Sequence, residues 1–362
     1  MSFFINLFKT KKEEPIPTYA GFWDWFSKNE KLLYKGIKRG ENIDEKVLDP
    51  LMERLQAVNK QFYCQVGMFD DNTADLVITA EGDIKNFVFV DEIIDAAPKL
   101  PNWKFTNLKP KDGVNLTTHM AGYEFSEDTL SFIAYIDPDY PDEIDISLVH
   151  KDYNEQDERT ITNGSFIFLD TILGEYNAAI IIDSVTVKGK ESIDNELISI
   201  KKLEEYLIWR EKEFIEKYKG SRKSDEKDTF SSYEAKSKQG NPIFAIMNSS
   251  LLDWEAKPSH PWMMVIEFTY EGNNGMPDEI NYKTMDDFED ELVAVLKNTE
   301  GYLNIGRQTG ENKRHLYFAC KEFKKASKTT AELIEKYKTT LDITYDIYRD
   351  KYWRTLNRFI HI

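Results

Sequence analysis

Residues 194–240 read DNELISIKKLEEYLIWREKEFIEKYKGSRKSDEKDTFSSYEAKSKQG. The first part, residues 196–219, is predicted to form one long, heavily charged helix. The second part, residues 220–240, has no apolar periodicity and is rich in Ser, Lys, Asp and Gly, which is typical of a linker. Because a helix that runs into such a segment often ends a domain, this stretch predicts two folded domains. The predicted parts are an N-terminal tail (1–17), an acidic α+β domain ending in the charged helix (18–220), a flexible linker (221–240) and a second α+β domain (241–362).

The length and composition agree with two domains. The chain has 362 residues, of which 41% are hydrophobic and 13% aromatic, enough for two apolar cores. Its formal net charge of −17 is uneven, because residues 1–220 carry −15 and residues 221–362 carry −2. The acidic part should repel nucleic acid and suit a basic protein partner. The alternative interpretation is that acidity only keeps the protein in solution.

The cysteine content and the N-terminus indicate the compartment. With only Cys64 and Cys320, the chain has no disulfide framework, which favours a reducing compartment. The N-terminal tail has a short apolar run followed by basic residues, the reverse of a secretory signal. No segment approaches the roughly 18 apolar residues of a membrane span. We therefore expect a cytoplasmic protein, whose tail docks on the domain, is disordered or touches a membrane weakly.

The first domain shows alternating helical and strand patterns. Trp23, Phe26, Leu33 and Ile37 are spaced to share one helix face. We predict helices over residues 22–38, 44–59, 87–97 and 156–173, and strands over residues 62–69, 74–80, 103–108, 132–136, 144–150 and 177–187. The last helix should break or begin near Gly164. The strongly apolar last strand should lie at the centre of a sheet.

The second domain has a regular order of elements. We predict strands over residues 243–248, 262–270, 301–307, 315–321 and 341–348, helices over residues 284–298 and 324–338, and a short closing segment over residues 351–359. Thr284 is the expected N-cap of the first of these helices. From residue 262 the order is strand, helix, strand, strand, helix, strand, which indicates a ferredoxin-like split β-α-β sandwich.

Several segments of the second domain resemble a known bacterial family. These segments are PWMMVIEF (261–268), Gly306-Arg307, LYF (316–318) and DKYW (350–353). They resemble the domain of unknown function 695 over about residues 242–360. The first half, with FWDWF (22–26) and AAPKLPNWKF (96–105), looks like an uncharacterised segment that often precedes this domain in bacteria. The family has no established activity, so the resemblance assigns no catalytic or binding residue.

No catalytic, cofactor or metal-binding motif stands out. The chain has no His-x3-His or Cys-x2-Cys pair, no Gly-x-Ser-x-Gly and no glycine-rich phosphate loop. The acidic loop 137–143 alternates oxygen ligands as a calcium site does, but it lacks the EF-hand glycine and terminal glutamate. A solvated turn is the simpler interpretation of this loop. We therefore predict no cofactor, no metal and no catalytic residue.

Tryptophans, arginines and histidines of the second domain form the candidate ligand or partner surface. Arginine and tryptophan often anchor interfaces and anionic ligands. The alternative is that the tryptophans fill the core and the arginines cap its rim. The candidate residues are Trp254, His260, Trp262, Arg307, Arg314, His315, Trp353 and Arg354.

These observations favour a non-enzymatic protein-binding or regulatory module. The alternative is a hydrolase-type enzyme with its site in the cleft between the domains. A third hypothesis, an RNA-associated regulator, would use the lysines of residues 321–338, but no aromatic side chains alternate with them as stacking platforms. The oligomeric state and the identity of a partner stay open.

Overall fold

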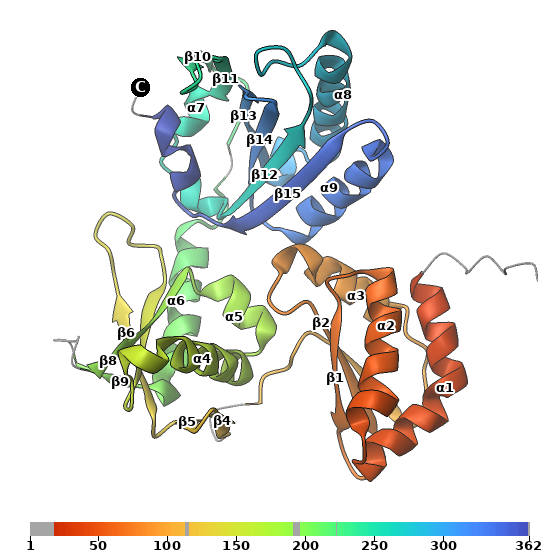
Figure 1. The fold of residues 1–362 in the computed structure, drawn as a ribbon. Coiled ribbons are helices and arrows are strands. Elements are labelled where there is room, and N and C mark those ends of the chain that lie inside the picture. The colour runs from red at the N-terminus through yellow and green to blue at the C-terminus, as the bar shows by residue number, and fades with distance from the viewer. Residues whose placement is uncertain (1–17, 113–115, 191–195, 222, 361–362) are drawn as a thin grey trace, which may run out of the picture. The chain divides into compact units, whose positions relative to one another are not determined.

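The computed structural model describes residues 18–112, 116–190, 196–221 and 223–360. Helices and strands both contribute strongly, with 42% helix and 28% strand, so the protein is of the α+β class (Figure 1). The described chain divides into two compact units. The first holds residues 18–79 and 90–107, and the second holds residues 80–89 and 108–360.

The first unit is a three-stranded sheet with helices. Its elements are α1 (Tyr19–Arg39), a π-helical turn (Asp44–Leu48), α2 (Asp49–Val58), β1 (Tyr63–Met68), β2 (Ala74–Thr79), most of α3 (Phe87–Asp95) and β3 (Trp103–Asn107). The sheet order is β1-β2-β3, with β1 and β2 antiparallel and β2 and β3 parallel. The predicted elements of this part are confirmed.

Helix α1 supplies much of this unit's core. The predicted apolar stripe is confirmed, because Trp23, Phe26, Leu33 and Ile37 are buried. The Trp23 indole donates a hydrogen bond to the Ile93 carbonyl at 2.7 Å, so this large ring leaves no polar atom unpaired. The helix therefore packs through the face that its residue spacing predicts, although it begins at Tyr19, three residues before the predicted start.

The second unit contains a four-stranded sheet of order β8-β7-β6-β9. Its strands are β6 (Leu130–Tyr135), β7 (Asp145–His150), β8 (Ser184–Gly189) and β9 (Ile198–Ser199), with a separate hairpin of β4 (Thr118–Met120) and β5 (Tyr123–Phe125). The accompanying helices are α4 (Glu158–Leu173), α5 (Glu175–Ile181) and α6 (Leu203–Lys217). One apolar cluster joins the sheet to α4 and α6.

Three predictions for this region are wrong. The central strand over 177–187 is instead the end of α5 followed by the edge strand β8, because Gly174, at φ 77°, ends α4 and lets a new helix start. Helix α4 does not break at Gly164, which packs against the Phe125 ring. Helix α6 begins at Leu203 rather than Glu196, because the preceding residues pair with β6 as strand β9.

The C-terminal part of the second unit is built on a six-stranded antiparallel sheet of order β10-β11-β13-β14-β12-β15. Figure 1 shows α8 and α9 on one face of this sheet, and α7 and the closing 3-10 helix on the other. The strands are β10 (Phe230–Lys236), β11 (Pro242–Asn248), β12 (Trp262–Thr269), β13 (Tyr302–Gly310), β14 (Lys313–Cys320) and β15 (Asp342–Arg349). The helices are α7 (Ser249–Leu252), α8 (Glu279–Val295), α9 (Lys324–Tyr337) and the 3-10 helix Arg354–Phe359.

Two further predictions fail here for local reasons. Residues 221–240 are not a linker throughout, because strand β10 pairs with β11 along its whole length. Backbone pairing can hold such a strand without apolar residues at every second position. Helix α8 begins at Glu279 and not at Thr284, because the Asp278 side chain accepts a hydrogen bond from the Asn281 amide at 2.7 Å.

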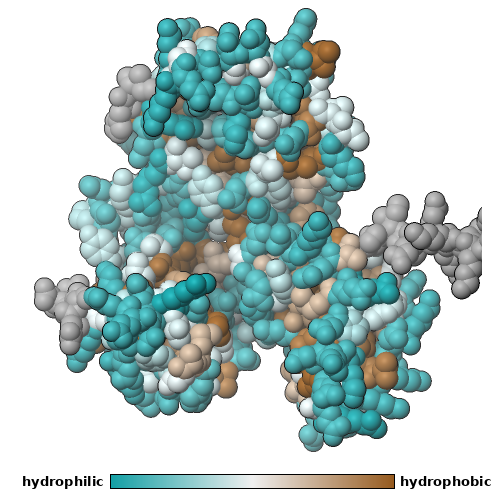
Figure 2. Space-filling view, in the orientation of Figure 1, coloured by the Kyte–Doolittle hydropathy of each residue, from teal (hydrophilic) through white to brown (hydrophobic). Residues whose placement is uncertain are grey.

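In the part of the chain that the structure describes, no helix is long and apolar enough to cross a membrane. Figure 2 shows a mainly hydrophilic face with apolar side chains gathered in separate areas. Exposed apolar areas of this kind can mark interaction sites.

Candidate functional site

The eight predicted surface residues do not form one surface. Trp254, His260 and Trp353 pack together in the core, with the Trp254 ring 5.3 Å from the His260 ring and 6.1 Å from the Trp353 ring. The Trp353 indole donates to the His260 carbonyl at 3.0 Å. Burial, helped by Lys321, lowers the pKa of His260 to about 3, so its imidazole is neutral at physiological pH. These three side chains build the core.

Three more of the eight lie in separate places. Trp262 packs against Phe323 at 4.8 Å on the helix-covered face. His315 extends to the opposite face of β14 from Arg314 and contacts the Glu267 carboxylate at 2.8 Å. Arg354 pairs with the Glu143 carboxylate at 2.8 Å, beside the four-stranded sheet.

Arg307 and Arg314 do converge, on the face of the sheet that carries α8. The Arg314 Nη1 donates to Asp286 at 2.6 Å, and the Arg307 Nη1 donates to Glu289 at 2.7 Å. Asp286 also lies 3.5 Å from Arg307, so two arginines and two carboxylates form one neutral ion cluster. The Arg314 side chain is fully buried, and its Nη2 has no hydrogen-bond partner among the described residues.

Next to this ion cluster, two strands of the sheet are left uncovered. Arg307 lies opposite Ile246 in the β13–β11 pair, and Thr309 lies opposite Phe244. Directly paired residues point to the same side of a sheet, so Phe244 and Ile246 face the α8 side. Their neighbours Ala245 and Met247 point to the other side, into the core.

The uncovered strands expose large apolar side chains. Phe244 is 41% exposed, Ile246 is 40% exposed, and Phe230 of the neighbouring strand β10 is 63% exposed. Among the described helices, α7 is the one that packs closely on β10 and β11, and it lies on their other side, with Ala245 and Met247. We call this surface the open face and define it by Phe230, Phe244, Ile246, Ser232 and Glu234.

Helix α8 borders the open face with one side of its surface. Tyr282, Asp286, Glu289 and Val293 recur at spacings of four, three and four, so they form a single stripe. Because Asp286 and Glu289 of this stripe contact Arg307 of β13, the stripe faces away from α9 and toward β11. Tyr282 and Val293 at its two ends are both exposed. The open face therefore has an apolar and ionic border along α8.

Phe244 and Ile246 are not among the eight residues predicted from the sequence. The signal was present, because Ile-Phe-Ala-Ile-Met (243–247) is apolar on both sides of a strand and therefore needs cover on both faces. The two helices predicted for this domain suffice for four strands. A fifth strand with two apolar faces thus leaves one face uncovered.

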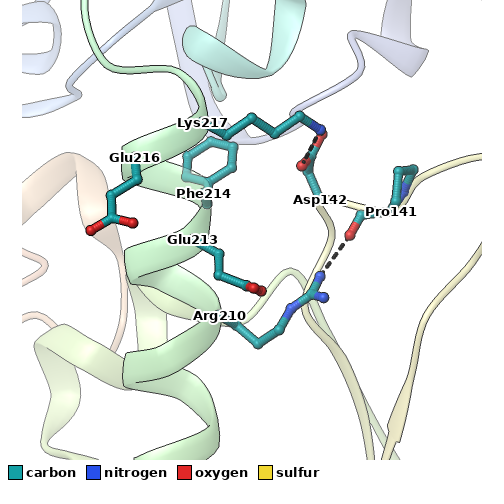
Figure 3. A pocket seen from close by; sticks show the side chains of 7 residues that line it. All are labelled: Pro141, Asp142, Arg210, Glu213, Phe214, Glu216 and Lys217. Carbon is teal, nitrogen blue, oxygen red and sulfur yellow. Dashed lines mark hydrogen bonds and ion pairs between the residues drawn. The ribbon is translucent and has the colours of Figure 1, made fainter.

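A second candidate is the pocket of about 370 Å³ beside α6 (Figure 3). Its described lining contains no Ser, Thr, Cys or His that could act as a nucleophile or base. Arg210 donates to the Pro141 carbonyl at 2.6 Å, Lys217 donates to Asp142 at 2.8 Å, and Glu216 points away from them. The lining residues are Pro141, Asp142, Arg210, Glu213, Phe214, Glu216 and Lys217.

One of the three carboxylates that line this pocket, that of Asp142, already has its hydrogen bonds satisfied. Asp142 accepts hydrogen bonds from Lys217, Tyr218 and Tyr352, each at 2.8 Å. Burial alone would raise the pKa of Asp142, but these hydrogen bonds outweigh it and lower the pKa. A carboxylate held in its charged form by three donors stabilises structure and makes a poor proton acceptor.

A buried ionic network continues from this pocket to the C-terminal sheet. Lys351, which is fully buried, donates to the Asp183 carboxylate at 2.7 Å and to the Asp142 carbonyl at 2.5 Å. Arg349 also donates to Asp183, at 2.8 Å. We call Asp142, Glu143, Asp183, Arg349, Lys351 and Arg354 the ionic junction. It joins the four-stranded and the six-stranded sheets of the second unit.

The described residues offer no metal-binding site and no reactive thiol. No group of three or more His, Cys, Asp or Glu side chains is arranged there to hold a metal ion. Burial raises the pKa of Cys64 to about 12, and burial also raises the pKa of Cys320. Both cysteines are therefore neutral thiols, which are poor nucleophiles and poor metal ligands.

The protein is of the α+β class, and the six-stranded sheet of its C-terminal part extends beyond the strands that α8 and α9 cover. Residues 234–361 match the Family of unknown function (DUF695). This match confirms the resemblance predicted for about residues 242–360. Comparisons with curated proteins and with solved structures find no match.

Proposed function

We propose that this chain is a non-enzymatic protein-binding module whose C-terminal part binds a partner protein through the open face. The observation that supports the proposal is the exposure of Phe230, Phe244 and Ile246 on two adjacent strands. Fully burying an exposed side chain of this kind is worth roughly 1.5–3 kcal/mol, and Phe244 and Ile246, at about 40% exposed, contribute the corresponding fraction each. Exposed apolar patches with a polar border are typical of protein interaction sites.

The proposal includes the architecture that carries the open face. Residues 262–349 would form a ferredoxin-like sandwich, to which β10 and β11 are added at one edge. The strand order β15-β12-β14-β13, with all neighbours antiparallel, supports this assignment. The acidic domain over 18–220, its boundary near residue 220 and the bacterial, cytoplasmic setting stay predictions.

The two alternatives have weaker support. The described lining of the pocket beside α6 has no Ser, Thr, Cys or His, and its Asp142 is held in the charged form, so the pocket gives a hydrolase weak support. The lysines predicted to contact RNA are largely neutralised within the protein. Their ion pairs are Lys325–Glu300, Lys328–Glu332, Lys336–Glu291 and Lys338–Glu335.

Site-specific photo-crosslinking tests the proposed function. A photoreactive amino acid replaces Ile246 in the full chain, which is produced in cells of the source organism. The matched control carries it at Ile208 of α6, which is also apolar and exposed. We expect a discrete protein adduct from position 246 and none from position 208. Absence of an adduct at position 246, or the same adducts at both positions, would overturn the proposal.

A further inference from the structure

We infer that the open face binds an amphipathic helix of the partner, with basic residues along the flank that lies beside α8. This inference rests on the proposed function and specifies the class of partner. The occupant follows from the width of the open face, from the position of its apolar side chains and from the charge of α8.

The width of the open face fits one helix. Neighbouring strands lie about 4.8 Å apart, so two strands span about 10 Å, which is close to the diameter of a helix with its side chains. Helices α8 and α9 lie over the four strands β13, β14, β12 and β15. At the same ratio of one helix to two strands, β10 and β11 leave room for a third helix.

The position of the apolar side chains favours a helix over an added strand. Phe244 and Ile246 lie on β11, which already has a neighbour on each side. An extended peptide added at the outer edge of β10 would pair with that strand and leave both side chains exposed. A helix lying across β10 and β11 would cover Phe230, Phe244 and Ile246 with one apolar stripe.

The charge of α8 indicates basic residues in the partner helix. Four of the six acidic residues of α8 already pair with cations of the protein, namely Asp286, Asp287, Glu289 and Glu291, so the charge that a partner meets comes from the other two. Glu279 and Asp290 lie three residues before and eight residues after Tyr282, so they flank the stripe that borders the open face. Both are exposed. A partner helix seated beside them gains favourable electrostatic energy from Lys or Arg on that flank.

Synthetic helices test this inference with the full chain. Three fluorescent peptides of about 15 residues, or about four turns, serve as probes. The first is an amphipathic helix of leucine, alanine and lysine with lysines on one flank. The second replaces each lysine by glutamate, and the third has the composition of the first with its apolar periodicity scrambled. Binding is measured by fluorescence anisotropy at about 150 mM salt, where long-range attraction to an acidic protein is screened.

We expect the first peptide to bind at least tenfold more tightly than the other two. Ile246→Glu should weaken its binding at least tenfold, and Asp290→Lys should weaken it severalfold. The control Ile208→Glu, also an exposed isoleucine, should leave binding unchanged. Because Ile246 is 40% exposed, its substitution should not prevent folding, and circular dichroism checks this for each variant. Phe244→Ser provides a second variant of the open face.

Two results would overturn the inference. One is equal binding of the first and scrambled peptides, and the other is unchanged binding to both Ile246→Glu and Phe244→Ser. If position 246 crosslinks to a partner in cells but none of the peptides binds, the helix inference fails and the proposed function stands. If no crosslink forms at position 246, the proposed function itself fails.

Discussion

Lys351 shows how one buried charge can hold two sheets together. Its ammonium group lies between the Asp183 carboxylate and the Asp142 carbonyl, and it also stacks over the Phe214 ring at 4.5 Å. Burial and the nearby Arg349 lower the pKa of Lys351. The attraction of Asp183 acts in the opposite direction and offsets only part of this shift. Such an ion is tolerated only because every side of it has a partner.

Replacing this lysine should therefore be costly. We expect Lys351→Met to lower the free energy of unfolding by about 3 kcal/mol, because Asp183 would keep only one of its two cationic partners. Urea unfolding of the full chain measures the change. The control is Lys338→Met, whose exposed ion pair with Glu335 should contribute less than about 1 kcal/mol. Similar losses for the two variants would contradict a structural role for the ionic junction.

Glu143 should make the stability of the protein depend on pH. Burial raises the pKa of this carboxyl from its ordinary value of 4.5 to about 7, against the pull of Arg354. The folded state therefore holds the proton more tightly than the unfolded state, and the stabilisation is present below about pH 4.5 and lost as the pH rises through 7. Relative to Glu143→Gln, the wild type should lose up to about 3 kcal/mol over this range.

Urea unfolding of the wild type and Glu143→Gln at several pH values tests this expectation. Because the glutamine does not titrate, the difference between the two proteins isolates the contribution of Glu143. A difference that stays constant from acid to neutral pH would show that Arg354 compensates the burial completely.

Among the helices, α4 shows how packing can require a residue that helix propensity disfavours. Glycine weakens a helix interior by about 1 kcal/mol relative to alanine, and this is why a break near Gly164 was expected. The helix nevertheless continues through Gly164. A Cβ atom at this position would lie only 2.1 Å from the Phe125 ring, so the packing requires glycine here. The close approach of β5 to α4 thus depends on this glycine.

Gly164→Ala should consequently destabilise the protein although alanine favours helices. We expect a net loss of about 1–3 kcal/mol from the clash with Phe125, measured by thermal unfolding. Gly67→Ala in β1 is the matched control, since no atom lies within 4 Å of its Cβ position. Adding Phe125→Leu to Gly164→Ala should restore part of the stability. A Gly164→Ala protein as stable as the wild type would mean that α4 and the β4–β5 hairpin can move apart at little cost in free energy.

Strand β10 matters for the whole C-terminal part. It completes the six-stranded sheet, and its Tyr233 ring lies 5.9 Å from the Phe359 ring at the opposite end of this segment. A boundary at residue 241, as the sequence predicted, removes this strand and exposes one edge of β11.

Two fragments measure the contribution of β10. Residues 221–362 should melt roughly 5–10 °C above residues 241–362, which corresponds to about 2 kcal/mol for a domain of this size. Both fragments lack Asp183 and the four-stranded sheet, so the difference measures residues 221–240, which hold β10 and the Asp228 and Thr229 contacts that anchor it. Equal melting temperatures, by circular dichroism, would indicate that β10 adds nothing to the folded sheet.

The sequence by itself determined the α+β class, most of the helices and strands, and the family resemblance over about residues 242–360, which the match over residues 234–361 confirms. These properties depend on residues close together in the chain, such as the spacing of Trp23, Phe26 and Leu33 along one helix. The eight candidate residues share a composition typical of interfaces, but the structure divides them. Trp254, His260 and Trp353 pack against one another, and Arg307 and Arg314 meet in the ion cluster beside α8.

Only the tertiary structure decided which apolar faces are covered. The run 177–187 is apolar like a central strand, yet Gly174 and the neighbouring sheet make its first half a helix. Phe244 and Ile246 are as apolar as the buried Met247, and they are exposed because α7, the described helix that packs closely on β11, lies on its other side. Burial depends on elements far apart in the sequence, and local residue patterns do not contain those distances.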